Sequence, residues 1–293
     1  MSFDNMPDRG ELMLPGAKEY ADGCIARSRK VVAETRCVID VPYGDDFYHR
    51  LDIFLPDDET LTGLPVLLFF HGGAWRHGFK EWLGFMAPVL TNLPAIFVSA
   101  NYRLTPEAKH PAPFNDCVDA LAWLYRNVAD YGGSPDRLFV GGHSAGGHLA
   151  ALAGLKRDAW AARGLPDDVV KACFPLSGPV NLRLDEMDPE GRRIKVTRLL
   201  LARDEDDRDA SPLDQLAGNR TPFFIAYGEN DLPEVVLNNG ELIAALARED
   251  CVVESHEFAG TGHSQTNENC GDPKNLWVQT VRAWMATPPP YGG

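Results

Sequence analysis

Apolar runs alternate with amphipathic segments along most of the chain. Residues 65–70 (PVLLFF) are apolar at every position, so we expect a strand that is covered on both faces. Residues 114–128 carry apolar side chains at the spacing of a helix with one buried face. Because this alternation continues to residue 285, the sequence predicts an α/β fold in which helices cover both faces of a mostly parallel, eight-stranded sheet. Ligands of such sheets bind at the carboxyl ends of the strands.

The same patterns place the other elements. Turn-prone Pro, Gly and Asp residues separate two strand-like runs near the start of the chain, which favours an antiparallel hairpin at the edge of the sheet. The hairpin strands are expected at 37–41 and 51–55, and later strands at 95–100, 137–140, 172–176, 222–226 and 252–258. The remaining helices are expected at 17–33, 79–90, 145–155, 234–246 and 273–285.

The sequence contains no Pro/Gly/Ser-rich or charged linker, so we expect a single domain spanning residues 37–286. A polar, charge-rich insertion at about 182–213 lies between two strand ends and is expected to form a small lid. Residues 1–36 are expected to form an N-terminal segment that packs across the body or caps the site, and residues 287–293 a C-terminal tail.

The stretch that joins the strand at 137–140 to the next helix reads Gly142-His143-Ser144-Ala145-Gly146. This is G-x-S-x-G in a strand-to-helix context, where the turn is strained and the serine is exposed. Glycines flank Ser144 because side chains would collide in so tight a turn, and the helix N-terminus directs N–H groups toward a developing oxyanion. The pattern predicts a nucleophilic serine. The alternative is a glycine-rich turn in which Ser144 only caps the helix.

A second glycine-rich loop, His71-Gly72-Gly73-Ala74-Trp75, follows the buried strand at 65–70. Its glycines leave backbone N–H groups unhindered, as a loop that donates hydrogen bonds to a ligand oxygen requires. Taken alone, the loop would be interpreted as an ordinary glycine turn. Combined with the turn at Ser144, it indicates an oxyanion-binding loop.

A serine nucleophile needs a base and a group that orients the base. His263 fits the first role best, because it follows the last strand in a glycine-rich loop from which its ring can reach Ser144. Asp231 leaves the end of the preceding strand and is the expected orienting carboxylate, and Glu229 is the alternative. The order Ser144, Asp231, His263 is the one expected for this type of turn.

Other polar residues near these motifs are interpreted as structural. We expect His71 to hold its own loop in place, His143 to point away from Ser144, and His148 to be packed. The acidic run at 204–207 is interpreted as a solvated loop, because a run of carboxylates does not by itself specify the geometry of a cation site.

These motifs give the chain a resemblance to the α/β-hydrolase superfamily from about residue 37 to 285. HGGAW at 71–75, NYRLTPEAKHPAPFNDC at 101–117 and the serine turn resemble the hormone-sensitive-lipase-like serine esterases. GHSAGGHLA at 142–150, SPL at 211–213 and YGENDLPE at 227–234 more closely resemble the kynurenine formamidase-like branch. The resemblance implies an oxyanion hole formed by the backbone N–H groups of Gly73, Ala74 and Ala145, with Gly72 shaping the loop.

The implied activity is that of a serine hydrolase that cleaves a small carboxylic ester or aryl (form)amide through an acyl-enzyme. This chemistry requires neither a metal nor a cofactor. Trp75, Phe79, Trp82 and Phe85 are candidates for an aromatic substrate pocket, and core packing is the alternative for each. Two alternative functions remain: hydrolysis of a lactone or carbamate by the same triad, and ligand binding without catalysis.

Charge and composition narrow the expected partners and location. The formal net charge of −14 and the pI of about 5.0 disfavour nucleic acid and anionic membrane surfaces as partners. No window is apolar enough for a membrane span, and the first residues lack the pattern of a signal peptide. The six cysteines have no C-x-x-C spacing, so we expect reduced thiols in a cytoplasmic protein. The sequence does not indicate an oligomeric state.

Overall fold

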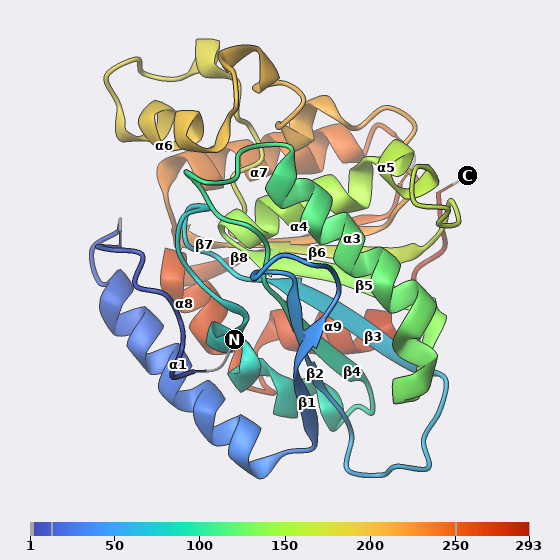
Figure 1. Cartoon of the computed structure of the whole chain (residues 1–293). Coiled ribbons are helices and arrows are strands. Elements are labelled where there is room, and N and C mark those ends of the chain that lie inside the picture. Colours follow the sequence, from blue (N-terminus) through green and yellow to red (C-terminus); the bar gives the residue numbers. More distant parts are fainter. Residues whose placement is uncertain (1–2, 13, 250, 293) are drawn as a thin grey trace.

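The computed structural model describes residues 3–12, 14–249 and 251–292. Its centre is an eight-stranded sheet with the strand order β1-β2-β4-β3-β5-β6-β7-β8 (Figure 1). The first two strands pair with their neighbours in antiparallel orientation, and all later pairs are parallel. The strands are β1 (Cys37–Pro42), β2 (Arg50–Phe54), β3 (Leu64–Phe70), β4 (Ile96–Ala100), β5 (Gly133–His143), β6 (Val170–Leu176), β7 (Phe223–Asn230) and β8 (Val253–Gly262). The expected mostly parallel sheet and its antiparallel edge hairpin are confirmed.

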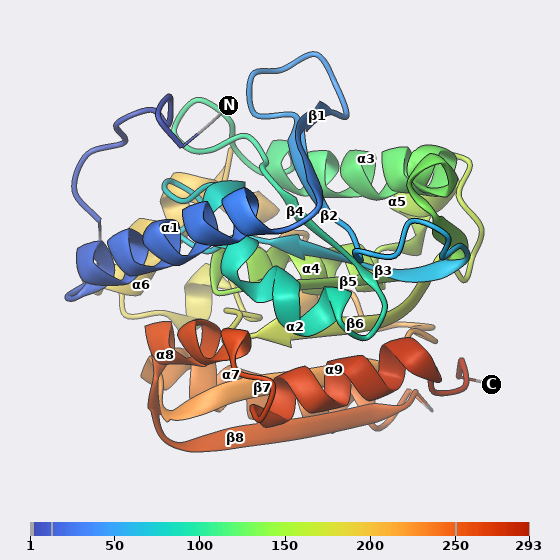
Figure 2. The ribbon, with the colours of Figure 1, turned by 90° about the horizontal axis from the view of Figure 1, so that it is seen from below.

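Helices cover both faces of the sheet (Figures 1 and 2). The central strand β3 shows why, because its alternate side chains enter two different cores: Leu68 belongs to one apolar cluster and Phe69 to the other. The cluster around Leu68 is completed by α3 (Ala112–Asn127), α4 (Ala145–Leu155), α5 (Arg157–Ala161) and α7 (Pro233–Leu246). The cluster around Phe69 is completed by α1 (Ala17–Glu34), α2 (Ala87–Thr91) and α9 (Leu276–Ala286).

The segment after the glycine-rich loop differs from the expectation of one helix at 79–90. Two short 3₁₀ turns, Lys80–Trp82 and Gly84–Met86, precede the five-residue helix α2. Gly84 is a poor helix former, and Pro88 has no N–H to continue a helical ladder from the preceding turn. The apolar pattern therefore predicted the burial of this segment correctly, but the predicted conformation was wrong.

The end of the last strand also differs from the sequence-based expectation. Pairing between β7 and β8 continues as far as Asn230 and Gly262, so the residues expected to form a glycine-rich loop extend the sheet instead. His263 then begins helix α8 (His263–Glu268). A short helix, rather than a loop, thus holds the backbone of this histidine.

The insertion at 182–213 contains helix α6 (Arg192–Leu200) and lies at the top of Figure 1. Its two ends are joined to each other, because the N–H of Leu182 donates to Ser211 Oγ (2.7 Å), and to the preceding segment, because the N–H of Leu213 donates to the carbonyl of Val180 (3.1 Å). The N–H of His110 also donates to the carbonyl of Leu200 at the end of α6 (2.7 Å). The base and one end of the insertion are therefore fixed by hydrogen bonds.

A buried ionic cluster stabilises the segment that follows the glycine-rich loop. The ammonium group of Lys80 lies 2.8 Å from Asp40 and Asp52 and 2.9 Å from Glu81, and its side chain is 1% exposed. Burial alone would lower the pKa of Lys80, but Asp52 and Glu81 raise it above its ordinary value, so the lysine remains charged. The cluster joins this segment to strand β2.

Replacing Lys80 with methionine should strongly destabilise the fold. The change leaves the buried carboxylates without this cation, and breaking such a pair costs about 3–5 kcal/mol. Urea denaturation of Lys80→Met should show the loss as a lower midpoint. Lys18→Met, which removes an exposed ion pair with Asp22, is the matched control and should leave the midpoint close to that of the wild type. Equal midpoints for all three proteins would contradict the prediction.

Candidate active site

Ser144 occupies the turn between β5 and α4 with backbone angles φ 54° and ψ −120°. A positive φ is strained for a residue with a side chain, so the surrounding structure must hold it. A Cβ atom at Gly142 would lie 2.2 Å from the carbonyl oxygen of Gly146, and one at Gly146 would lie 2.0 Å from that of Phe70. Both positions therefore require glycine, as the G-x-S-x-G pattern indicated.

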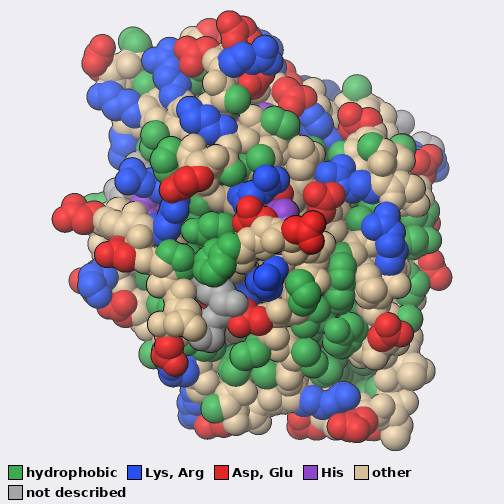
Figure 3. Space-filling view, viewed as in Figure 1, with side chains coloured by type: hydrophobic (Ala, Val, Ile, Leu, Met, Phe, Trp, Pro, Cys, Tyr) green, Lys and Arg blue, Asp and Glu red, His purple; other side chains and the backbone are tan. Residues whose placement is uncertain are grey.

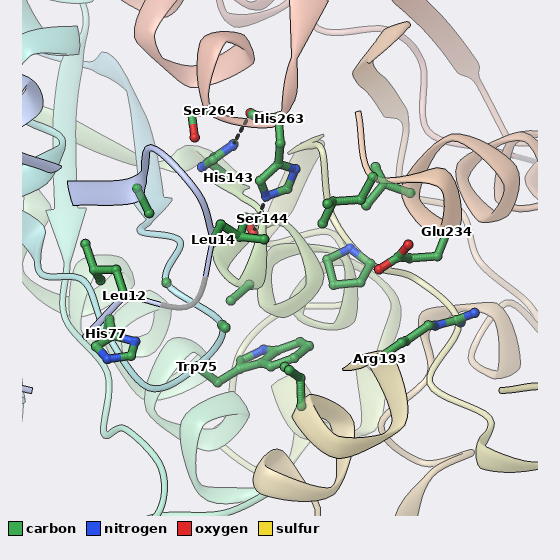
Figure 4. Close-up of a pocket in the computed structure, with 18 of the residues that line it drawn as sticks. Leu12, Leu14, Trp75, His77, His143, Ser144, Arg193, Glu234, His263 and Ser264 are labelled. Atoms are coloured by element: carbon green, nitrogen blue, oxygen red, sulfur yellow. Dashed lines mark hydrogen bonds between the residues drawn. The ribbon is translucent and has the colours of Figure 1, made fainter. Parts of the chain in front are cut away.

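Ser144, His263 and Asp231 form a continuous hydrogen-bonded chain. The Oγ of Ser144 lies 2.8 Å from Nε2 of His263, and Nδ1 of His263 lies 2.6 Å from Oδ1 of Asp231. An ionised carboxylate only accepts, so Nδ1 carries the proton and Nε2 is free to accept from the serine hydroxyl. Figure 4 shows the ring of His263 directed at Ser144 inside the pocket.

Asp231 is buried at the end of β7 and is held by four donors, of which the most distant is the N–H of Gly228 (3.4 Å from Oδ2). Besides His263, the hydroxyl of Ser177 donates to Oδ2 (2.6 Å), and the N–H of Leu232 donates to Oδ1 (2.7 Å). Burial alone would raise the pKa of Asp231, but the hydrogen bond and charge of His263 and the Ser177 hydroxyl hold it below the ordinary value. The carboxylate therefore stays ionised.

The rival carboxylate lies elsewhere. Glu229 is exposed and accepts a hydrogen bond from the N–H of Gly260 (2.7 Å). Ser177, by contrast, was not recognised from the sequence. Its position directly after β6, at the same sheet edge as Asp231, is the signal that could have indicated it.

His143 does not point away from the nucleophile as the sequence suggested. Its ring lines the pocket, with its centroid 5.0 Å from that of His263, and its Nε2 lies 3.0 Å from the carbonyl oxygen of His263. Thr266 donates to the same carbonyl (2.7 Å). The expectation failed because strand alternation was extended into a turn that no longer obeys it. His143 thus helps to hold the backbone of His263.

The N-terminal helix contributes to the same arrangement. The hydroxyl of Tyr20 in α1 donates to Oδ1 of Asn267 in α8 (2.7 Å), and its ring lies 6.0 Å from that of His143. Tyr20 lines the pocket together with Leu12, Leu14 and Ala17. No sequence motif marked Tyr20 or Asn267, because their contact joins residues far apart in the chain.

The glycine-rich loop after β3 is held in an unusual backbone conformation. Gly73, Ala74 and Trp75 have φ values of 119°, 53° and 57°. His71 ties the loop down as expected, because its ring stacks on Tyr102 at 4.4 Å and its carbonyl accepts from the Tyr102 hydroxyl (2.8 Å). These contacts fix the loop beside the turn at Ser144.

The loop and the start of α4 present unpaired N–H groups to the pocket. Gly73, Ala74 and Ala145 line the pocket around Ser144, whereas a Cβ atom at Gly72 would lie 3.1 Å from that of Ser144. Within the part of the chain that the structure describes, no group accepts a hydrogen bond from the N–H of Gly73, Ala74 or Ala145. These three N–H groups are therefore candidates for binding an oxygen atom beside the serine hydroxyl.

The pocket above Ser144 is mainly apolar and has walls from three parts of the chain. The N-terminal segment lies on one side of Ser144 and the residues of α6 and α7 on the other (Figure 4). Besides the residues already named, the lining comprises Trp75, His77, Trp82, Pro179, Asn181, Leu182, Arg192, Arg193, Val196, Thr197, Leu232, Glu234, Val235 and Ser264.

Two of the four aromatic residues that were candidates for the pocket lie outside it. Trp75 and Trp82 line the pocket, but Phe79 and Phe85 do not, and both pack in the core on the α1 side of the sheet. Arg27 lies over the ring of Phe85 at 4.0 Å. The four residues do not share a face because the expected helix is replaced by 3₁₀ turns.

The acidic run at 204–207 is occupied by contacts within the protein. Asp204 pairs with Arg198 (2.8 Å), Asp206 pairs with Arg203 (2.7 Å), and Asp207 accepts from the N–H of Leu184 (2.9 Å). Among the described residues, no group of three or more His, Cys, Asp or Glu side chains could hold a metal ion. On the face shown in Figure 3, acidic and basic side chains are interspersed.

No helix among the described residues is long and apolar enough to span a membrane. The six cysteines are all free thiols, and five of them are buried.

Comparison with known proteins identifies the family. The sequence profile of the BD-FAE family matches residues 51–245, which is more than half of the chain. The chain belongs to the BD-FAE family. Esterases are among the curated relatives of this BD-FAE protein: esterase LipC of Mycobacterium tuberculosis is 34% identical over 275 residues, which cover 88% of this chain and 66% of LipC. The resemblance to esterases of the α/β-hydrolase superfamily is thus confirmed.

Two other relatives of this BD-FAE protein extend the comparison. Kynurenine formamidase of Danio rerio is 27% identical over 255 residues, which cover 87% of this chain and 83% of that protein. The crystal structure of an esterase from Pyrobaculum calidifontis matches with a TM-score of 0.72 over 92% of each chain at 23% identity, which shows a shared fold. The BD-FAE chain spans 47% to 66% of the length of the mycobacterial relatives that it matches.

The buried histidines of the site should make the fold sensitive to acid. Burial lowers the pKa of His71 to about 4 and the pKa values of His143 and His148 to about 3. In the unfolded chain these groups titrate near the ordinary value of about 6.5, so the unfolded state takes up protons first as the pH falls. Their contribution to the free energy of unfolding is therefore complete above about pH 6.5 and is lost toward pH 3–4.

Each such histidine contributes a slope of up to about 1.4 kcal/mol per pH unit below pH 6.5. Urea denaturation at pH 7.0, 6.0 and 5.0 should show the free energy of unfolding falling with pH. His148→Gln removes one titrating group and should reduce this slope. A free energy that stays constant from pH 7 to pH 5 would show that the histidines are not held neutral.

The two candidate carboxylates can be distinguished by kinetics. Asp231→Asn removes the acceptor that fixes the His263 tautomer and should lower kcat by about 10⁴-fold. Glu229→Gln is the matched control, since its carboxylate bonds only to the N–H of Gly260 and its loss should change kcat by less than about threefold. The reverse ranking of the two kcat values would make Glu229 the orienting acid.

Proposed function

We propose that this BD-FAE protein is a serine hydrolase that cleaves a small carboxylic ester or an aryl (form)amide. The observation that carries the proposal is the chain of hydrogen bonds from Ser144 through His263 to Asp231 at the floor of an apolar pocket. Esterase LipC and kynurenine formamidase, which both cleave a carbonyl-to-heteroatom bond as their names state, support the assignment to this class of reaction.

Catalysis would proceed in two halves. Ser144 Oγ attacks the carbonyl carbon while His263 Nε2 takes its proton, and Asp231 stabilises the imidazolium that forms. His263 then protonates the leaving group, which departs and leaves an acyl-enzyme on Ser144. Water, deprotonated by the same imidazole, attacks the acyl carbon, and Ser144 leaves as the free hydroxyl. The proton leaves Ser144 and returns to it along its 2.8 Å contact with His263, and the same Nε2 gives a proton to the leaving group and takes one from water.

The negative charge on the carbonyl oxygen would be stabilised by the N–H groups of Gly73, Ala74 and Ala145. These donors have no partner among the described residues, so they need not break a bond within the protein when the oxyanion forms. Ala145 adds the positive end of the α4 dipole. Gly72 supports the loop by its close approach to Ser144.

The pocket favours a compact, largely apolar substrate. Its volume of about 110 Å³ is below the roughly 150 Å³ of a cavity that admits benzene. Trp75, Trp82 and Tyr20 provide aromatic surface close to Ser144. These features support a short acyl group, with an aryl or apolar group reaching toward the pocket mouth.

Three finer points stay predictions. Lactone or carbamate hydrolysis would use the same triad, and a non-catalytic binding protein would keep the pocket without turnover. The cytoplasmic location rests on the sequence alone.

A probe of the nucleophile and a substrate panel test the proposal together. Wild-type protein should react with a fluorophosphonate and hydrolyse short p-nitrophenyl esters, and Ser144→Ala should abolish labelling and lower kcat by about 10⁴- to 10⁶-fold. Ser134→Ala, at the opposite end of β5, is the matched control and should retain activity. An unlabelled wild-type protein would indicate the binding-protein alternative.

The panel should run N-formylkynurenine beside esters of increasing acyl length at one pH. We expect kcat/KM to fall as the acyl chain outgrows the pocket. Selective turnover of the formamide would assign the protein to the formamidases, and turnover confined to esters would assign it to the esterases. Esterase activity that persists in Ser144→Ala would overturn the assignment of the nucleophile.

A further inference from the structure

His148 joins three parts of the site, although it neither bonds to the serine hydroxyl nor lines the pocket itself. It lies one turn into α4 and is fully buried, and its backbone N–H donates to the carbonyl of Ser144 (3.0 Å). Its Nδ1 lies 3.1 Å from Nε1 of Trp75 in the glycine-rich loop, and its Nε2 lies 2.7 Å from the carbonyl of Ala210 in the 182–213 insertion.

The chemistry of the partners fixes the protonation of His148. The indole of Trp75 can only donate, so Nδ1 must accept, and the carbonyl of Ala210 can only accept, so Nε2 must carry the proton. Burial lowers the pKa of His148 to about 3, which keeps the ring neutral with both nitrogens satisfied. A neutral imidazole can accept a hydrogen bond at one ring nitrogen and donate one at the other, as this buried position requires.

The bond to Trp75 connects the two halves of the proposed oxyanion hole. One half is the N–H of Ala145, which lies on α4, three residues before His148. The other half is formed by Gly73 and Ala74, next to Trp75 on the loop. The relative position of the halves decides whether their N–H groups converge on one oxygen, and errors of about 1 Å in such a site cost about 10²-fold in rate.

The loop needs such a support because its conformation is strained. Ala74 and Trp75 both have positive φ, which the surrounding structure must hold in place. Trp75 is held at both ends: its carbonyl accepts from the N–H of Thr105 (2.9 Å), and its indole donates to His148. The indole bond is the one that connects the loop directly to the helix of the nucleophile.

We propose that His148 is a positioning residue that sets the separation of the two halves of the oxyanion hole and links it to the 182–213 insertion. The inference rests on the proposed hydrolase function. Loss of the link lets the loop move away from α4, so the transition state loses stabilisation while the apolar pocket still binds the ground state.

The test compares His148→Leu, which loses both hydrogen bonds, with His148→Gln, whose amide can accept from Trp75 and donate to Ala210. For a short p-nitrophenyl ester, His148→Leu should lower kcat about 10- to 100-fold and change KM by less than about threefold. The inhibition constant of a trifluoromethyl ketone, which Ser144 converts into an oxyanion adduct, should rise by the same factor as kcat/KM falls. His148→Gln should recover part of the loss.

Two controls separate positioning from stability. Leu152→Ala removes a buried side chain farther along α4 and should lower the melting temperature without changing kcat of the folded protein. Trp75→Phe removes the donor of the same hydrogen bond. Adding His148→Leu to Trp75→Phe should therefore lower kcat little further. The Trp75 variant also tests the link if the single His148 variant folds poorly. If the kcat losses of the single variants His148→Leu and Trp75→Phe simply multiply in the double variant, the proposal is overturned. A wild-type kcat in His148→Leu would overturn it as well.

A measurement that does not depend on catalysis tests this proposal separately from the hydrolase function. The Trp75 indole N–H, assigned in NMR spectra by its absence in Trp75→Phe, should exchange slowly in the wild type and rapidly in His148→Leu. Slow exchange in both proteins would overturn the link. A wild-type protein that shows the protected indole but hydrolyses no substrate would overturn the proposed function, and with it the catalytic role of His148.

Discussion

The close approach of backbone to backbone at the Ser144 turn is the constraint on which the site depends. Gly146 packs so tightly against the end of β3 that a Cβ atom would lie 2.0 Å from the carbonyl of Phe70. The glycine-rich loop begins at the next residue, so the same contact that exposes Ser144 also brings the loop beside the start of α4. The proposed nucleophile and the proposed oxyanion donors are therefore positioned by one packing arrangement, in which a single methyl group would be too large.

Buried neutral histidines stabilise this arrangement. His71 bonds to the carbonyl of Gly72 within the loop, His143 holds the backbone of His263, and His148 joins the loop to α4. The His148 ring uses one donor and one acceptor to connect two segments without introducing a charge that burial would penalise, whereas His71 and His143 each bond through one ring nitrogen. Since the proposed catalytic step would create an imidazolium and an oxyanion, neutral neighbours would leave their stabilisation to Asp231 and the backbone N–H groups.

The sequence predicted the parts of the fold and site that follow from local pattern. Continuous apolar runs located the central strands, and the order of Ser144, Asp231 and His263 identified three residues that the structure brings together. The failures involve tertiary context. The pattern at 79–90 indicated burial but could not distinguish a helix from 3₁₀ turns. The position of Ser177 after β6 places it at the right edge of the sheet, but its contact with Asp231, 54 residues away, depends on the tertiary fold.

Part of the pocket wall comes from segments outside the alternating core. The N-terminal segment and the 182–213 insertion supply residues such as Leu12, Tyr20 and Val196, whereas the candidate catalytic groups lie at strand ends and on the short helices that follow them. Side chains in the walls can change without disturbing the glycine packing at Ser144, because they contact the pocket rather than the turn. The bond between His148 and Ala210 is a point at which the pocket walls and the candidate catalytic groups meet, since it connects the base of the insertion to the oxyanion loop.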